Sequence, residues 1–288
     1  MVLLLDLAWT RYGELALLAL ALAYGIGFFI AGDRQWRRRP LQVPGGLLIA
    51  LAVGMVPLIV LTLQRILGLW SPDPGVDLAA WGHSGKLPAE AATAIAGLAA
   101  ILRYRFPFIL CLPIAALWML LMDGLGVAYP DAASGNLYLW ATVGYAGALA
   151  AAGWTIDGRT ERDLSFWLYL VGLLGLWGAM SILFADGDVA GAVYCLGSLV
   201  LMLGAVLFQR RAFAVFGGLG LAFYFIDLAE RLFQDSLMFP IALSAIGIAV
   251  IVAGLWYYRH MASIEGWLGN HLPAPLRALR PARLRGDG

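Results

Sequence analysis

Long apolar segments dominate the chain and constrain its fold more than any other feature. A transmembrane α-helix needs about 20 mostly apolar residues, and nine segments of roughly this kind follow one another. They are residues 13–32, 45–70, 89–103, 107–123, 137–154, 165–185, 189–208, 212–233 and 237–258. Hydrophobic residues make up 62% of the 288 positions and charged residues 13%, whereas soluble domains are roughly 45–50% apolar. The sequence therefore predicts an all-α, polytopic transmembrane helix bundle, formed as a single unit by residues 1–259.

The third of these segments is the weakest. Its mostly apolar core runs from Ala91 to Leu102, which is shorter than a spanning helix requires. The helix must therefore extend through Pro88 and Glu90, or it is thinner than the bilayer. A re-entrant third segment would change the orientation of every later helix.

The basic residues predict the orientation, because loops rich in Arg and Lys are retained in the cytoplasm. Nine alternating spans with the N-terminus outside place 15 of the 19 basic residues on the cytoplasmic side. The other four, Arg11, Arg65, Lys86 and Arg231, fall outside or near the outer face. We therefore expect an external N-terminus and a cytoplasmic C-terminus.

Two clusters of arginines are expected to anchor the cytoplasmic face. One follows the first segment, and the other lies in a basic cytoplasmic tail at residues 260–288. The anchoring residues are Arg34, Arg37, Arg38, Arg39, Arg277, Arg280, Arg283 and Arg285. Each of the four arginines in the tail is expected to attract anionic lipid head groups by roughly 1 kcal/mol. Because no aromatic residues alternate with the tail arginines, the expected partners are the bilayer and anionic head groups, and not nucleic acid.

The other ionisable residues argue against several familiar sites. None of the three histidines falls within an apolar segment, so no pair is placed to ligate haem. The single lysine, Lys86, is expected in a loop outside the helices, which excludes a retinal Schiff base within the bundle. Cys111 and Cys195 lie inside apolar segments, where packing is their expected role. We therefore predict no cofactor and no metal site.

The most unusual stretch is FYFIDLAERLFQD, from Phe223 to Asp235, where an apolar helix end becomes charged. A spacing of four residues places Asp227 and Arg231 on one side of a helix. Ionisable side chains at membrane depth are costly and are therefore candidates for function. This stretch is consequently a candidate binding site.

Charged residues in four other segments lie at a similar depth. Counted at about 1.5 Å per residue from the inner helix ends, they fall in the outer third of the membrane core. The candidate binding residues are Asp227, Arg231, Glu230, Arg65, Glu14, Glu90 and Asp123. One interpretation is an outward-open polar vestibule, in which Arg65 or Arg231 neutralises some of the carboxylates. The alternative is a set of helix-end residues that reach the interface, with Asp227 and Arg231 as an ordinary i, i+4 pair.

The last four segments resemble one another as two hairpins, residues 165–211 and 212–259. Internal repeats of this kind are common in transporters. The segment from Leu164 to Arg259, above all ERLFQDSLMFPIALSAIGIAVIVAGL, resembles the C-terminal half of polytopic bacterial membrane proteins that share a domain of unknown function. This resemblance implies a bacterial inner-membrane protein, and it transfers no activity or catalytic residue.

Three functions are compatible with these features. Binding or transport of a small solute, ion or lipid head group is favoured by the outer charges and by the kinks expected at Pro57 and Pro113. A structural or accessory subunit is favoured by the small residues, such as Gly144 and Gly172, that allow close helix packing. An enzyme acting on a lipid-linked substrate is the third function. No acid–base or metal signature supports it, so we assign no catalytic residue and favour a non-enzymatic protein.

Overall fold

The computed structural model describes most of the chain as helices. The described residues are 2–38, 41–69, 83–129, 135–157, 164–184, 188–208, 210–232, 241, 244–249, 251–252, 255–256 and 259. Among them there is no β-strand, in agreement with the all-α prediction. The helices group into two compact units, Met1–Ala141 and Thr142–Gly288, which we call the N-terminal unit and the C-terminal unit and describe separately.

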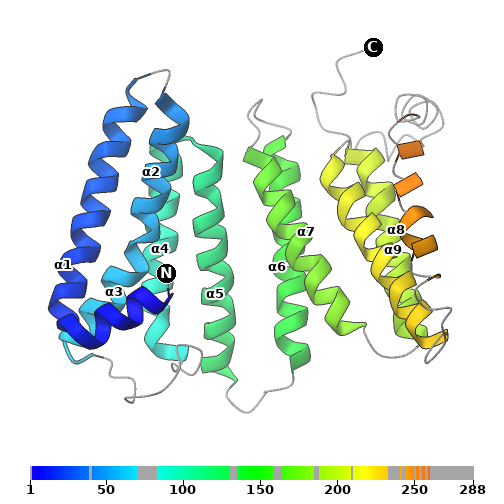
Figure 1. Ribbon diagram of the computed structural model, residues 1–288, viewed down its shortest axis with the longest axis horizontal. Coiled ribbons are helices and arrows are strands. Elements are labelled where there is room, and N and C mark those ends of the chain that lie inside the picture. Colours follow the sequence, from blue (N-terminus) through cyan, green and yellow to red (C-terminus); the bar gives the residue numbers. More distant parts are fainter. Residues whose placement is uncertain are drawn as a thin grey trace. The chain divides into compact units, whose positions relative to one another are not determined.

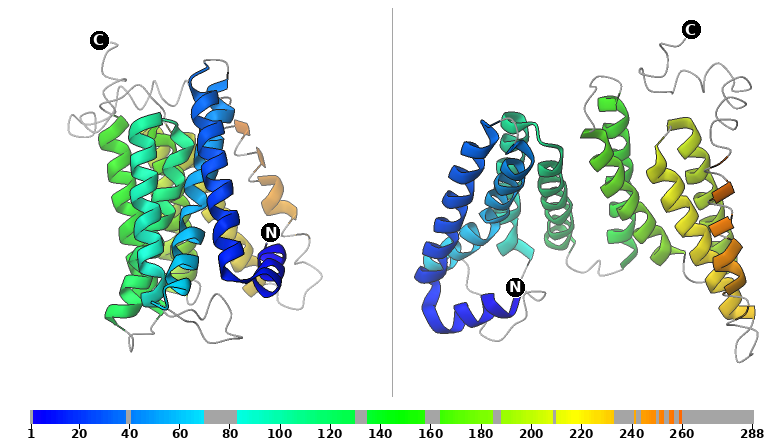
Figure 2. Two further views of the ribbon diagram at one scale, coloured as in Figure 1. Left: turned by 90° about the vertical axis from the view of Figure 1, so that its left-hand side faces the viewer. Right: turned by 45° about the horizontal axis from the view of Figure 1, so that its top comes forward.

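The N-terminal unit begins with a long helix, α1 (Val2–Trp36), which bends at Gly13. The backbone of Gly13 has φ 74° and ψ 168°, a conformation that glycine adopts readily and other residues rarely do. Figure 1 and Figure 2 show the segment before this residue turned away from the rest of the helix. The spanning part of α1 therefore starts next to Glu14.

The second apolar segment forms two helices, α2 (Gln42–Gly54) and α3 (Val56–Ile66). Pro57 lies in the first turn of α3, where its missing N–H group is tolerated. The helix is thus interrupted at Met55, two residues before Pro57, and the kink expected at Pro57 stays a prediction. The expectation for Pro113 needs correction, because a 3₁₀ turn, η3 (Pro107–Leu110), precedes α5 (Cys111–Ala128) and places this proline near the start of α5, not in mid-helix.

The helices of the N-terminal unit approach one another closely at glycines. A β-carbon on Gly45 of α2 would lie 2.7 Å from the backbone nitrogen of Trp36. One on Gly97 of α4 (His83–Tyr104) would lie 2.7 Å from the ring of Pro113 in α5. In lipid the hydrophobic effect does not hold helices together, and small residues allow the close van der Waals packing that does. These contacts therefore fix how α1 meets α2 and how α4 meets α5.

The C-terminal unit contains α7 (Leu164–Leu183), α8 (Asp188–Phe208) and α9 (Arg211–Leu232), and also most of α6 (Gly135–Asp157). Gly217 of α9 packs against the backbone of Ser198 in α8, and Gly172 of α7 packs against Ala146 in α6. The contact at Gly172 confirms the close packing predicted there, whereas a β-carbon on Gly144 of α6 would meet nothing within 4 Å, so the close packing expected at Gly144 is not seen among the described residues. A cluster around Tyr169 and Phe213 forms the buried core of this unit.

Six helices of the described part are long and apolar enough to cross a membrane. They are Gly13–Trp36, Gln42–Ile66, Gly85–Tyr104, Pro107–Ala128, Ser165–Leu183 and Arg211–Arg231. The prediction that the third segment extends through Pro88 and Glu90 is confirmed, because α4 is continuous over 22 residues. Nine spans and the orientation of the termini stay predictions, and so does a single bundle over residues 1–259. Half of the last apolar segment and all of the tail lie outside the described residues.

The contact of Gly45 with α1 gives a test of helix packing. We expect Gly45→Ala to lower the stability of the protein in detergent by about 1–3 kcal/mol, because the new methyl group would meet backbone that cannot move aside. Thermal unfolding followed by circular dichroism measures the effect. Gly27→Ala is the matched control in α1, since a β-carbon there meets nothing within 4 Å. Equal melting temperatures for the two variants would contradict this packing.

Candidate functional site

The seven candidate binding residues divide between the two units. Glu14, Arg65, Glu90 and Asp123 belong to the N-terminal unit, and Asp227, Glu230 and Arg231 belong to the C-terminal unit. Contacts among these side chains are therefore described separately for each unit.

Glu14 and Arg65 form an ion pair between two helices. The Arg65 Nε atom lies 3.1 Å from Oε1 of Glu14. Glu14 directly follows the bend of α1, and Arg65 lies in the last turn of α3. The pair therefore links the ends of two adjacent helices and leaves the Glu14 carboxylate neutralised.

Glu90 and Asp123 form a second cluster, together with Lys86. Lys86 and Glu90 are four residues apart on α4, so they share a face of the helix. The Lys86 Nζ atom lies 3.9 Å from Oδ2 of Asp123 on α5. The Glu90 carboxyl group interacts with both Asp123 and Lys86. Residues that the sequence separates by more than 30 positions are thus brought into one site.

Glu90 is the most confined member of this cluster. The residue is only 8% exposed, and its Oε2 atom is buried without a hydrogen-bond partner among the described residues. A buried carboxylate is costly unless its charge is compensated. Glu90 is therefore a carboxyl group with one oxygen free to hold a proton or a cation.

Two carboxyl groups lie close together in this cluster. With both ionised, Glu90 and Asp123 carry one negative charge more than the ammonium group of Lys86 balances. Like charges this close do not ionise together readily, so one carboxyl group retains a proton or the site takes up another positive charge. The arrangement is consequently suited to exchange one proton for one small cation.

The sequence-based interpretation of this region missed two residues. Lys86, which we expected in a loop, lies inside α4, because the backbone hydrogen bonds of the helix continue beyond its apolar part. Gln64, on α3, carries a buried Oε1 atom without a hydrogen-bond partner among the described residues. The only sequence signal for Lys86 was its spacing of four from Glu90, and Gln64 gave none.

The candidates in the C-terminal unit are arranged differently. Arg231 Nε lies 2.9 Å from Oδ2 of Asp227 in the same helix, and the Asp227 side chain is 49% exposed. Glu230 is exposed as well. This geometry fits the alternative of an ordinary i, i+4 pair at a helix end better than it fits a vestibule.

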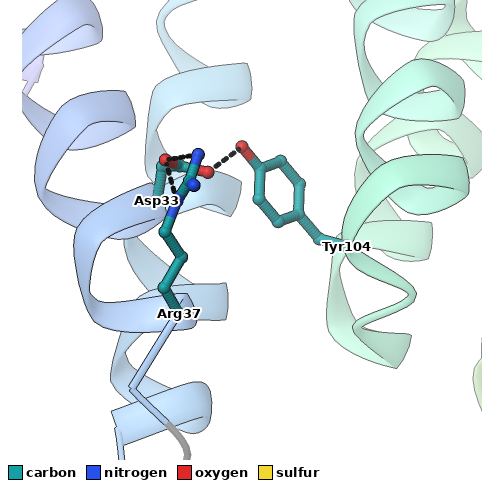
Figure 3. Close-up of polar contacts among 3 residues, drawn as sticks. All are labelled: Asp33, Arg37 and Tyr104. Carbon is teal, nitrogen blue, oxygen red and sulfur yellow. Dashed lines mark hydrogen bonds and ion pairs between the residues drawn. The ribbon is translucent and has the colours of Figure 1, made fainter.

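The opposite end of the N-terminal unit carries part of the predicted anchoring cluster. Arg34, Arg37 and Arg38 are exposed there, and Arg37 pairs with Asp33 at 2.8 Å. Figure 3 shows that Asp33 also accepts a hydrogen bond from the hydroxyl of Tyr104, at 3.1 Å, which links α1 to the end of α4. Arg39 and the tail arginines Arg277, Arg280, Arg283 and Arg285 lie outside the described residues.

Comparisons of the chain with protein-family models, curated proteins and solved structures gave no match. The resemblance of residues 164–259 to a bacterial membrane-protein family therefore stays a prediction.

The burial of Glu90 can be tested chemically. A hydrophobic carbodiimide reacts with carboxyl groups that are protonated in apolar surroundings and leaves a stable adduct. We expect it to modify Glu90 but not Asp227, which is exposed and ion-paired. Mass spectrometry of peptides from the treated protein measures both positions. An unmodified Glu90, or equal modification of Asp227, would contradict a protonated, confined Glu90.

Proposed function

We propose that the chain is an integral membrane protein that binds a small monovalent cation, inorganic or organic, at Glu90 and Asp123. Binding displaces a proton and is a step in moving the solute across the membrane. The observation that carries this proposal is the buried, unpartnered Oε2 atom of Glu90 beside a second carboxyl group. The bacterial inner membrane is the location that the sequence resemblance favours.

The surroundings of Glu90 support exchange at this site. Lys86 and Asp123 are partly exposed, so we expect water and small ions to reach the cluster. Lys86 forms an ion pair with Asp123 and so favours its ionised form. Glu90 is therefore the carboxyl group that gains or loses a proton. Because one positive charge replaces another, the buried site is not left with an uncompensated charge.

The position of the site supports access from outside the cell. Glu90 lies seven positions after the start of α4, which corresponds to about 10 Å along the helix. The orientation derived from the basic residues places this end at the outer face. The solute would therefore enter from the outer side.

Protection from the carbodiimide tests the proposed binding. Sodium, potassium and methylammonium would each be added to the detergent-purified protein at constant ionic strength, balanced with N-methylglucamine. We expect at least one of them to slow the modification of Glu90 in a concentration-dependent way, because the cation displaces the reactive proton. Unchanged modification with all three cations would contradict the proposal.

Substitutions test whether uptake of the cation depends on this site. Glu90→Gln and Asp123→Asn each remove a charged partner of the cation, so each should lower uptake of the protecting cation into proteoliposomes by about tenfold or more. Asp227→Asn is the matched control, because its carboxylate lies at a similar predicted depth but is exposed. Wild-type uptake in Glu90→Gln, or an equal loss in Asp227→Asn, would contradict the role of this site.

A further inference from the structure

An apolar cavity of about 480 Å³ lies in the N-terminal unit, away from Glu90 and Asp123. It is lined by α1, α2, α3 and α4 at the level where Pro57 separates α2 from α3. The small side chains of Ala96, Ala99 and Ala100 leave room between α4 and the neighbouring helices there. The volume lies in the range of roughly 300–1,000 Å³ that is usual for ligand sites.

The cavity opens along the side of α1. Its lining residues Ile26 and Phe29 are 57% and 50% exposed, and they belong to a helix that is long and apolar enough to cross a membrane. In a bilayer, such surfaces contact lipid tails. A hydrocarbon chain can therefore enter the cavity sideways without crossing a polar barrier.

One end of the cavity is positively charged. Arg103 and Tyr104 line this end, and the Arg103 guanidinium lies 5.6 Å from the centre of the Tyr104 ring. Asp33, the nearby carboxylate, is already paired with Arg37 and bonded to Tyr104. The exposed Arg103 makes no ion pair within 4 Å to any of the described residues, so its charge is available to an anion.

We propose that this cavity binds one acyl chain of an anionic phospholipid, with the phosphate of the head group at Arg103. The apolar walls suit the chain, and the guanidinium suits a phosphate, with which arginine forms bidentate hydrogen bonds. The basic end of the unit is also the end that the distribution of arginines places at the cytoplasmic leaflet, which is rich in anionic lipids. This lipid site is separate from the cation site at Glu90.

Native mass spectrometry of the full-length protein in detergent tests the lipid site. Delipidated protein would be titrated with phosphatidylglycerol and, separately, with phosphatidylcholine of the same acyl chains. We expect one phosphatidylglycerol to bind about fivefold more tightly than phosphatidylcholine, as one arginine at a head group implies. Equal affinity for the two lipids would overturn the proposal.

Two pairs of variants locate the binding. Arg103→Gln should remove the preference for phosphatidylglycerol, whereas Arg105→Gln, an exposed arginine outside the cavity lining, should keep it. Ala99→Phe fills the cavity and should abolish binding of this lipid, whereas Leu98→Phe, exposed but outside the lining, should not. Equal effects within either pair would overturn the proposed site.

A photoreactive lipid keeps the test independent of folding of the variants. Phosphatidylglycerol with a diazirine in its acyl chain would be crosslinked to the wild-type protein, and the modified peptides identified. Crosslinks concentrated at residues 22–29 and 96–104 would support the site, since these segments contribute the walls formed by α1 and α4. Crosslinks spread evenly over the apolar helices of both units would overturn it.

Discussion

Every polar group at membrane depth needs a partner, and this constraint governs how the described helices are held together. No water is available in the hydrocarbon core to replace a missing hydrogen bond or ion pair. The N-terminal unit meets the requirement at two levels. Glu14 and Arg65 join α1 to α3 at one end, and Asp33 joins α1 to Tyr104 of α4 at the other. Between them the helices meet through glycines, because close backbone contact is the main source of packing energy in lipid.

Two ionisable residues in this unit lack such a complete set of partners. Glu90 has a buried oxygen without a partner, and Arg103 has an exposed guanidinium without an ion pair among the described residues. Both lie on α4, separated by 13 positions in the chain, or about 20 Å along the helix. One helix thus carries a buried carboxyl group near one end and an exposed guanidinium group near the other. We propose a small cation as the ligand of the first and an anionic lipid as the ligand of the second.

The sequence predicted the helices well, because a long apolar segment can satisfy its backbone in a membrane only as a helix or a closed barrel. The break between α2 and α3 lies two residues before Pro57, where local chemistry disfavours a continuous helix. It did not predict that Lys86 lies inside α4, because hydrophobicity marks the apolar part of a helix and not its polar end. The pairing of Glu90 with Asp123 depends on which faces of distant helices meet, and the spacing of residues carries no such information. Arg103 was counted only as a cytoplasmic charge for the same reason.

The proposed function depends on the exchange of a proton for a cation at Glu90. Infrared difference spectroscopy measures this directly, because a protonated carboxyl group in apolar surroundings absorbs apart from carboxylates and backbone amides. Addition of the bound cation to the wild-type protein should remove a protonated-carboxyl band, and Asp227→Asn should give the same difference spectrum. The band should be missing in Glu90→Gln. A wild-type spectrum without any change in protonated carboxyl absorption, or the same change in Glu90→Gln, would contradict the exchange.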